Sequence, residues 1–362
     1  MPQPRFSVSA DISRAHTLHA DFYTRQEFFE SAKEKIFAHT WQFLHTTESL
    51  KEPGSVMPVT LLPDFLNEPL VITLDRQENL HVLSNVCTHR GALIASKPCT
   101  LHELRCPYHG RRFDLTGKFL SMPEFKEVQN FPTEADNLHE LPAFVTGNLV
   151  FTILQPKIEA NLFFGDMLQR MHWFNWQALK YRPDLSKDYE VKAHWALYCE
   201  NYLEGFHIPF VHASLNRVID FSEYRTELFA YSSLQLGIAR ANEIAFDLPP
   251  SSADYGKRVA GYYFFVFPNM MFNFYPWGLS LNIVKPVTPQ KTIVSFLTFI
   301  SDDRKYNQGA GSGLHQVELE DEAVVESVQQ GIRSRFYSTG RYSVKHEKGT
   351  HHFHRLIASF LG

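Results

Sequence analysis

Two short stretches of this chain each pair a cysteine with a histidine: residues 87–89 read Cys-Thr-His, and after sixteen further residues 106–109 read Cys-Pro-Tyr-His. Both lie near strand ends, and the second enters a turn that contains Gly110, so two loop tips can converge on one metal centre. The four candidate ligands are Cys87, His89, Cys106 and His109. Zinc accepts two cysteines and two histidines, but zinc fingers hold them as a cysteine pair and a histidine pair. A [2Fe–2S] cluster, with two cysteines on one iron and two histidines on the other, suits this division better, and zinc is the alternative.

The sequence around this motif predicts a small all-β domain. Short β-branched runs at 70–74, 80–86 and 149–154 are separated by turn residues such as Thr116-Gly117 and Gly147-Asn148. Ahead of them we expect a helix from Thr24 to near Trp41, because residues 24–27 form a capping box and apolar residues follow at helical spacing.

A second region begins after residues 155–157, where the strand pattern stops. It is expected to contain a helix from Trp195 to His207, then aromatic strands, then a helix from Leu314 to about Tyr337. The strands are predicted at 262–267, 271–275 and 293–300. The glycine-rich stretch 309–313 fits a flexible loop better than a phosphate-binding loop. The predicted fold class is α+β, divided into a helical segment (1–45) that packs on the last domain, a β-domain (46–155) and a second domain (156–362).

A second cluster of metal-ligating residue types follows within that region, where residues 200–212 read Glu-Asn-Tyr-Leu-Glu-Gly-Phe-His-Ile-Pro-Phe-Val-His. On a continuous helix Glu200, Glu204 and His207 would share one face. His207 and His212 are five residues apart, which on an ideal helix turns them about 140° away from each other. Pro209 interrupts the helix between them, so we expect both imidazoles to turn to one point. Two core histidines with ordinary hydrogen-bond partners are the alternative.

A carboxylate on the predicted C-terminal helix completes this set. Asp321 falls on an apolar stripe formed by Val317, Val324 and Val328. A separate stripe, expected to face solvent, is formed by Glu318, Glu322 and Glu326. A carboxylate on a buried face is costly unless a cation pairs with it. Two histidines and one carboxylate form the facial triad of non-haem iron(II), for which Asp321 is the expected third ligand and Glu320 the alternative.

Taken together, these residues resemble the oxygenase α-subunits of the Rieske non-haem iron oxygenases over nearly the whole chain. The first motif is similar to the Rieske pattern C-x-H…C-x2-H. Respiratory Rieske proteins carry an additional cysteine in each loop and a serine after the second histidine, whereas this chain has Ala92 and Arg111 where those features would begin. The stretches 200–209 and 267–277 look more like the branch that acts on quaternary ammonium compounds, the choline, glycine betaine, carnitine and stachydrine oxygenases.

The resemblance implies a fold, two cofactors and several partners. The fold would be a Rieske [2Fe–2S] domain and a helix-grip catalytic domain with an antiparallel sheet, and the second cofactor would be mononuclear iron(II) at His207, His212 and Asp321. No dinucleotide fingerprint occurs in the chain, so electrons would come from a separate NAD(P)H-dependent flavin or iron–sulfur reductase. The chain would be the terminal oxygenase of a monooxygenase or N-demethylase that uses O2. The resemblance also implies a homotrimer in which Glu204 links its iron to His109 of the next subunit.

The resemblance also implies how the substrate would be held. A small quaternary ammonium substrate would be held by aromatic faces, and the candidates are Phe272, Phe274, Tyr275 and Trp277, although alternating aromatics in a strand are more often core. Two alternatives stay open: an aromatic-ring-hydroxylating dioxygenase component, and a helix-grip protein that binds a small molecule without catalysis.

The composition excludes several classes of partner. The chain has 35 basic and 39 acidic residues, a net charge of −4, so neither nucleic acid nor an anionic membrane is expected. The N-terminus lacks a signal-peptide pattern and no run of 18 apolar residues occurs, which favours a cytoplasmic protein. With only four cysteines, Cys99 and Cys199 are expected to be buried apolar residues. Residues 351–354, rich in histidine, are expected in a packing helix.

Overall fold

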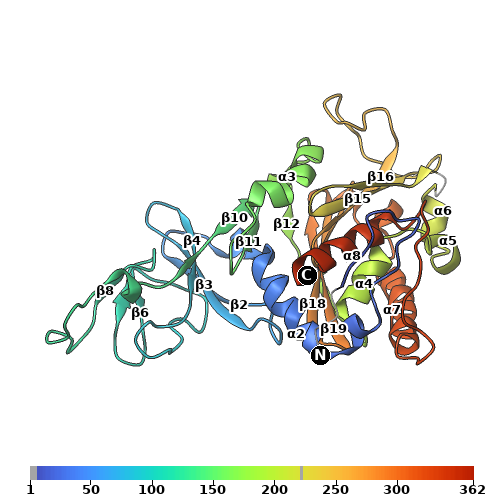
Figure 1. Cartoon of the computed structure of the whole chain (residues 1–362). Helices are drawn as coiled ribbons and strands as arrows, with labels where there is room; N and C mark the ends of the chain where they lie inside the picture. The colour runs from blue at the N-terminus through green and yellow to red at the C-terminus, as the bar shows by residue number, and fades with distance from the viewer. Residues whose placement is uncertain (1–5, 221–222) are drawn as a thin grey trace. The chain divides into compact units, whose positions relative to one another are not determined.

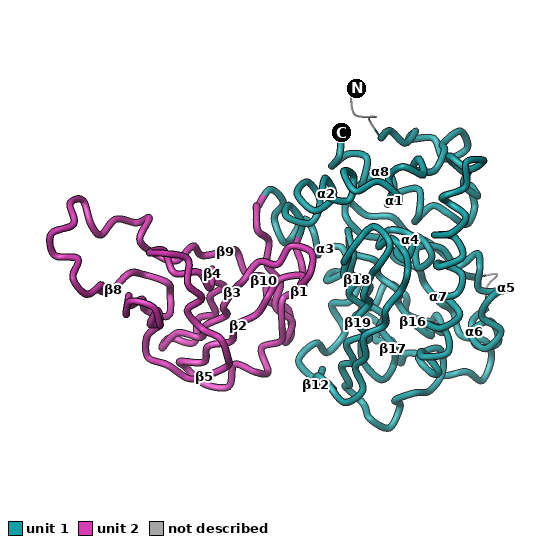
Figure 2. The backbone as a smooth tube through the Cα atoms, turned by 90° about the horizontal axis from the view of Figure 1, so that it is seen from below, with its two compact units in different colours: residues 1–40, 157–362 teal, residues 41–156 magenta. Residues whose placement is uncertain are grey.

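The computed structural model describes residues 6–220 and 223–362, and the chain separates into two compact units (Figure 2). One unit is Trp41–Pro156, and the other joins Met1–Thr40 to Lys157–Gly362. The boundaries expected from the sequence, 45/46 and 155/156, stay a prediction. Within the described ranges, no helix has the length and apolar character needed to cross a membrane.

The 41–156 unit consists of short antiparallel strands in three sheets. The first sheet has the order β1 (Gln42–Thr46), β11 (Leu149–Thr152), β10 (Ala143–Thr146). The second has the order β5 (Cys99–Thr100), β2 (Ser55–Leu61), β3 (Glu68–Leu74), β4 (Leu80–Ser84), β9 (Glu140–Leu141). The third has the order β6 (Leu104–Arg105), β7 (Arg112–Phe113), β8 (Phe119–Ser121). The short 3-10 helices are η2 (Thr47–Ser49) and η3 (Glu134–Asp136).

Strands β3 and β4 are apolar on both faces because each face covers a different core. Leu70 and Ile72 of β3 belong to one buried cluster, whereas Val71, between them, belongs to another. Successive side chains of a strand point to opposite faces, which explains the unbroken β-branched run in the sequence. The cluster that contains Val71 also contains Cys87 and Cys106, so this core supports the cysteine–histidine loops.

The other unit is built on one antiparallel sheet of eight strands (Figure 1). Its order is β12 (Lys180–Tyr181), β19 (Lys291–Ile300), β18 (Gly278–Thr288), β17 (Met270–Tyr275), β16 (Val259–Val266), β15 (Ser232–Ile238), β14 (Arg225–Leu228), with β13 (Lys187–Val191) also paired to β19. Together with the helices below, this sheet confirms the α+β fold class, with an all-β unit and a second unit that contains an antiparallel sheet. Strands β15 and β18 were not predicted from the sequence.

Helices pack around this sheet. The α-helices are α1 (Asp21–Thr24), α2 (Gln26–Lys35), α3 (Ala160–Arg170), α4 (Trp195–Tyr202), α5 (Ile208–Val211), α6 (Leu215–Val218), α7 (Leu314–Gly331) and α8 (Lys348–Leu361). The 3-10 helices are η1 (Phe37–His39), η4 (Trp176–Ala178), η6 (Asp303–Lys305) and η7 (Gly309–Gly311). Helix α4 contacts β18 and lies between α7 and α8 (Figure 1). The ring of Trp195 on α4 packs against the ring of Phe353 on α8.

Several local predictions were wrong. The capping box at 24–27 does not form, because Thr24 ends α1 and its hydroxyl donates to the carbonyl of Ala20. The C-terminal helix ends at Gly331 rather than near Tyr337. The glycine-rich stretch is not a loose loop: Gly311 is buried against Trp277, where a Cβ atom would lie 2.2 Å from the indole nitrogen.

Predictions about single cysteines and histidines fared better. Cys199 is buried, whereas Cys99 is only half-buried. Residues 351–354 lie in α8, and the buried His354 there is hydrogen-bonded to Tyr342 and lies 3.0 Å from Glu200, as expected of a packing helix.

Candidate metal centres and substrate cavity

The two cysteine–histidine loops have the same backbone conformation. In the first, the Cys87 N–H donates to the carbonyl of Ala92, and the Gly91 N–H donates to that of Cys87, each at 2.9 Å. In the second, the Cys106 N–H donates to the carbonyl of Arg111 at 2.8 Å, and the Gly110 N–H donates to that of Cys106 at 3.0 Å. Gly91 and Gly110 have φ of 74° and 73°, a left-handed conformation that glycine adopts without strain. The shared spacing therefore gives two equivalent loops.

The ligand side chains of these loops form a cysteine pair and a histidine pair. Both thiols are buried, and burial, together with the neighbouring Cys106, raises the pKa of Cys87. The rings of His89 and His109 lie 4.8 Å apart between centroids. The Nδ1 atom of His109 is buried and has no hydrogen-bond partner among the described residues. Buried groups of this kind fit a site that is completed by a metal cluster.

The four residues of these loops do not form one compact group of ligand atoms of the kind that binds a single ion. Zinc bonds of at most about 2.3 Å place any two ligand atoms within about 4.6 Å of each other. In the described part of the chain, only His207, His212 and Asp321 form a set of three or more such residues whose ligand atoms all lie within 4.8 Å. Two separated pairs are the arrangement that a two-iron cluster requires.

A buried arginine stands directly behind the second loop. Arg111 is 2% exposed, and its Nη2 donates to Asp136 Oδ1 at 2.6 Å. Its guanidinium carbon lies 5.0–5.8 Å from the ring centroids of Phe113, Phe119 and Phe131. The Asp136 carbonyl also accepts the hydroxyl of Thr88, at 2.8 Å, so Asp136 ties both loops together. The sequence analysis noted Arg111 only because it stands where respiratory Rieske proteins have a serine. That this arginine is buried could not be recognised from its neighbours in the sequence.

The second constellation does not lie on the continuous helix that was predicted. Helix α4 ends at Tyr202, and the carboxylate of Glu204 accepts the backbone N–H groups of Phe206 and His207. Gly205 makes the turn possible, since a Cβ atom there would lie 2.6 Å from the Tyr224 ring.

Pro209 begins a new helix here rather than simply breaking the old one. It lies in the first turn of α5, and His207 and His212 flank this single turn. The two imidazoles therefore meet, with centroids 5.0 Å apart. Glu200, expected on the same face, instead lies near His354.

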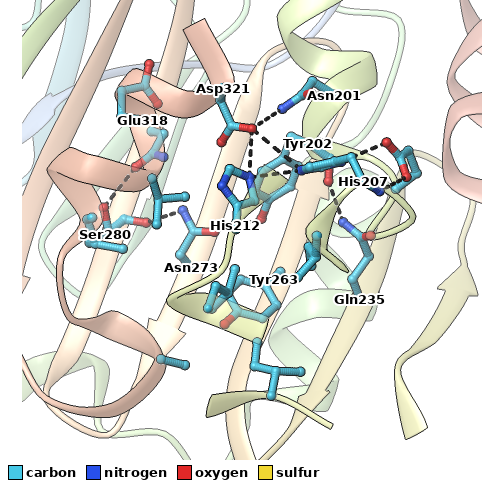
Figure 3. Close-up of a pocket in the computed structure, with 18 of the residues that line it drawn as sticks. Asn201, Tyr202, His207, His212, Gln235, Tyr263, Asn273, Ser280, Glu318 and Asp321 are labelled. Atoms are coloured by element: carbon cyan, nitrogen blue, oxygen red, sulfur yellow. Dashed lines mark hydrogen bonds and ion pairs between the residues drawn. The ribbon is translucent and has the colours of Figure 1, made fainter. Parts of the chain in front are cut away.

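His207, His212 and Asp321 converge through one atom each (Figure 3). The two Nε2 atoms are 3.1 Å apart, and Asp321 Oδ1 lies 3.0 Å from that of His212 and 3.5 Å from that of His207. Adjacent ligands on an octahedral ion with bonds of about 2.1 Å are about 3.0 Å apart. All three separations are close to that value, as in a facial triad.

Two glutamates orient these histidines from behind. Glu204 Oε1 lies 2.7 Å from His207 Nδ1, and Glu320 Oε2 lies 2.8 Å from His212 Nδ1. A carboxylate at Nδ1 holds the proton there, so each Nε2 presents a lone pair. Two lone pairs and a carboxylate oxygen then face one another, an arrangement that needs a cation. The carboxylate of Glu320 is bound to His212 Nδ1 and therefore does not join the three converging atoms. Asn201 Nδ2 donates to Asp321 Oδ1 at 2.5 Å.

Helix α7 is rotated relative to the prediction. Its buried residues are Glu318, Val325 and Gln329, whereas Val328, assigned to the apolar stripe, is 46% exposed. The rotation lets Glu318, at 2% exposed, accept the hydroxyl of Tyr198 on α4 at 2.5 Å. Burial, opposed by this hydrogen bond, raises the pKa of Glu318 to about 8. The expected solvent-facing stripe of glutamates is therefore wrong at its first member.

A cavity of about 110 Å³ lies beside the triad. Of the four aromatic candidates, Tyr275 lines it, whereas Phe272, Phe274 and Trp277 are buried and do not. Side chains of β17 alternate, so Asn273 and Tyr275 face the cavity while Phe274 packs against Phe174 and Trp176 on the other face. Trp277 stacks behind Tyr275.

Sequence reasoning missed the polar wall of this cavity. Its polar members on the sheet, several of them drawn in Figure 3, are Gln235, Asn273, Ser280 and Asn282, and its further tyrosines are Tyr198, Tyr202, Tyr224 and Tyr263. A signal was present, because single polar residues interrupt apolar strands, and Ser280 and Asn282 are two residues apart on one face.

Comparison with known proteins gives consistent matches. Residues 179–362 match the model of the ring-hydroxylating α-subunit catalytic domain, and residues 39–132 match that of the Rieske [2Fe–2S] domain. The chain is 29% identical to choline monooxygenase of Arabidopsis thaliana (97% of this chain, 84% of that protein). It is 25% identical to the carnitine monooxygenase oxygenase subunit of Escherichia coli K12 (96% and 95%). A solved structure of a quaternary ammonium Rieske monooxygenase, reported with insights into carnitine oxidation and inter-subunit electron transfer, has a similar fold, with a TM-score of 0.76 at 23% identity (98% of this chain, 100% of that chain).

Proposed function

The chain belongs to the ring-hydroxylating oxygenase α-subunit family, with a Rieske [2Fe–2S] domain ahead of its catalytic domain. On that premise we propose that it is the oxygenase component of a monooxygenase that hydroxylates a small quaternary ammonium substrate. The observation that carries the proposal is the convergence of His207 Nε2, His212 Nε2 and Asp321 Oδ1 at the wall of a tyrosine-lined cavity.

Two sets of residues hold the cofactors in this proposal. Cys87, Cys106, His89 and His109 bind the cluster, and His207, His212 and Asp321 bind the mononuclear iron. When bound, the cluster delivers single electrons and the iron, with coordination positions left open by the triad, activates O2.

The remaining polar residues of the site orient the ligands. Glu204 and Glu320 keep the two imidazoles in the tautomer whose Nε2 is free, and Asn201 restrains the carboxylate of Asp321. The surrounding side chains are packed around a small cavity, which limits access of water to the reacting groups.

The tyrosines favour a cationic substrate. Five tyrosines line the cavity, among them Tyr263 and Tyr275, whose rings are 5.9 Å apart. Aromatic faces attract a cation that has no hydrogen to donate. The choline and carnitine monooxygenases named above act on such compounds, as their names state. An aromatic-ring dioxygenase is less well supported, because an aromatic hydrocarbon would leave Gln235 Oε1 and the Tyr263 hydroxyl, which have no partner among the described residues, unsatisfied. A binding protein without catalysis would not need the Rieske domain.

The family also implies partners. Enzymes of this family need a reductase, and we propose a separate NAD(P)H-dependent flavin or iron–sulfur protein in that role. We further propose a homotrimer in which Glu204 links the iron of one subunit to His109 of the next. The half-buried ring of His109, whose buried nitrogen is Nδ1, is compatible with an outward contact through its other nitrogen.

The proposal is tested with the purified holoprotein, NADH and a generic reductase. We expect a red-brown protein with two irons and two sulfides per cluster plus one further iron. Substrate-dependent O2 uptake should occur with choline, carnitine or another quaternary amine. Uptake with benzoate or naphthalene alone would contradict the substrate class, and a colourless zinc protein would contradict the whole proposal.

A further inference from the structure

Two glycines are paired across neighbouring strands of the eight-stranded sheet. Gly237 on β15 lies opposite Gly261 on β16. Glycine weakens a strand because it loses the most conformational freedom on folding and has no side chain to pack. Neither residue has a positive φ, so neither backbone conformation requires glycine, and the register shift that follows the pair does not require it either. The more direct reason for both glycines is the space that they leave for a neighbouring side chain.

That side chain is Tyr263, whose ring lies over both glycines. A Cβ atom at position 261 would lie 2.9 Å from Cζ and from the hydroxyl oxygen of Tyr263, and a Cβ atom at position 237 would lie 3.0 Å from its Cε2. Carbon atoms in ordinary contact are about 3.5–4.0 Å apart. The Tyr263 ring therefore occupies the space that two ordinary side chains on the sheet would fill.

A displaced Tyr263 ring would have to move towards the substrate cavity. Gly261 and Tyr263 are two residues apart on β16, so they share the face of the sheet that lines the cavity (Figure 3). Tyr275 flanks the ring on one side, with the two centroids 5.9 Å apart. On the side of β15, Ile219 Cδ1 lies 3.4 Å from the Cβ position of Gly237. With the sheet beneath the ring and these two side chains beside it, an added methyl group at either glycine displaces Tyr263 into the cavity.

From this geometry we infer that the Gly237–Gly261 pair sets the largest ligand that the cavity admits, by letting the Tyr263 ring lie against the sheet. This inference rests on the proposed function and adds the residues that limit the size of its substrate. The glycines are positioning residues for Tyr263, which itself lines the cavity. Because the cavity is only about 110 Å³, a ring displaced by about 0.6 Å, the difference between 2.9 Å and ordinary contact, excludes a larger ligand before a smaller one.

A purely structural role of the two glycines predicts a different pattern of binding. If an added methyl group only strained the sheet, ligands of every size would bind more weakly by the same factor. If it acts through the Tyr263 ring, the loss of affinity grows with ligand size and disappears once the ring is removed. The size dependence of binding therefore distinguishes the two roles.

The test is isothermal titration calorimetry on the oxidised holoprotein without reductant, so that no turnover occurs. The probes are tetramethylammonium, ethyltrimethylammonium and tetraethylammonium, which carry the same charge and differ in size. Gly261→Ala should lower the affinity for tetraethylammonium, relative to that for tetramethylammonium, about tenfold. Where tetraethylammonium is too large for the unmodified protein, ethyltrimethylammonium gives the same comparison.

Three further variants complete the experiment. Tyr263→Leu should raise the affinity for the larger ion relative to the smaller one. Gly261→Ala added to Tyr263→Leu should change this ratio by less than about twofold, because the ring that the methyl group displaces is gone. Gly165→Ala on α3, where an added methyl group meets no atom within 4 Å, is the matched control and should leave the ratio unchanged.

The outcomes separate this inference from the function on which it rests. Equal weakening of all three ions by Gly261→Ala overturns the inference and leaves the proposed function standing, and so does a size effect of Gly261→Ala that persists beside Tyr263→Leu. If Gly261→Ala loses its cluster absorbance through misfolding, Tyr263→Leu alone decides, and an unchanged ratio overturns the inference.

If no ammonium ion binds to the unmodified protein, the proposed substrate class fails. The neutral alcohols tert-butanol and 3-ethylpentan-3-ol, which differ in size, then replace the ions with the same variants. A size effect of Gly261→Ala on these alcohols supports the inference, and its absence refutes it.

Discussion

The ion pair behind the cluster loops offers a prediction that compares two neighbouring arginines. Arg111 is 2% exposed and pairs with Asp136, whose side chain is 20% exposed. The next residue, Arg112, pairs with Glu103, but these side chains are 45% and 32% exposed. Asp136→Asn keeps the shape of the side chain and removes its charge, and Glu103→Gln does the same at the exposed pair.

The expected effects follow from burial. Removing one partner of a buried pair costs about 3–5 kcal/mol, and the partial exposure of Asp136 together with the acceptor that asparagine retains reduces this to about 2–3 kcal/mol. The exposed Arg112–Glu103 pair contributes little, because solvent screens the attraction between its charges. With a urea m-value of about 1.5 kcal/mol/M, Asp136→Asn should lower the midpoint by about 1.3–2 M, and Glu103→Gln should lower it much less.

The assay is urea unfolding of the full holoprotein at pH 7, followed by the visible absorbance of the cluster, which reports on the 41–156 unit. Because the buried Arg111 that pairs with Asp136 directly follows the second cluster loop, Asp136→Asn should release the cluster earlier in the titration than Glu103→Gln. Equal midpoints for the two variants would refute the argument that the buried guanidinium depends on its carboxylate.

Other predictions concern the iron, electron transfer, substrate and pH. Asp321→Ala should lose the mononuclear iron and keep the cluster, whereas Glu320→Gln should retain most of the iron; metal analysis showing the reverse would make Glu320 the ligand. Glu204→Gln should keep both metals and the trimer but stop cluster oxidation during turnover, and normal oxidation in stopped-flow spectra would exclude the inter-subunit link. Tyr275→Leu should weaken choline by about 1 kcal/mol in calorimetry, with Phe274→Leu, on the opposite face, as a control that changes only stability. At Asp75, burial is outweighed by hydrogen bonds from Asn79, His81 and Gln77, and the pKa falls from 3.8 to about 2, so its stabilisation is complete above pH 4 and is lost as pH falls towards 2. The urea midpoints of the unmodified protein and Asp75→Asn should therefore differ at pH 5, differ by about half as much at pH 3 and converge only towards pH 2; a constant difference would contradict the assignment.

The metal-binding loops were predictable from the sequence because their geometry is local. Cysteine and histidine separated by one or two residues, followed by a glycine at a left-handed position, close into the same loop wherever a β-domain supports them. The convergence of His207 and His212 also follows from a few neighbouring residues, although the reason differs from the prediction, since Pro209 starts a one-turn helix whose two ends carry the imidazoles.

Contacts between distant segments decided the rest. Whether Asp321 or Glu320 points at the histidines, and whether Glu318 faces water or the cavity, depends on the rotation of α7 about its axis. That rotation is set by packing on α4 and β13, more than a hundred residues earlier in the chain, and a helical repeat of valines does not encode it. The substrate wall likewise depends on which face of β17 and β18 is turned towards α4 and α7. Each strand is buried on both faces, so polar residues such as Asn273 mark one face in the sequence, but only the tertiary structure shows that this face, with Tyr275, lines the cavity while Phe272 and Phe274 lie in the core.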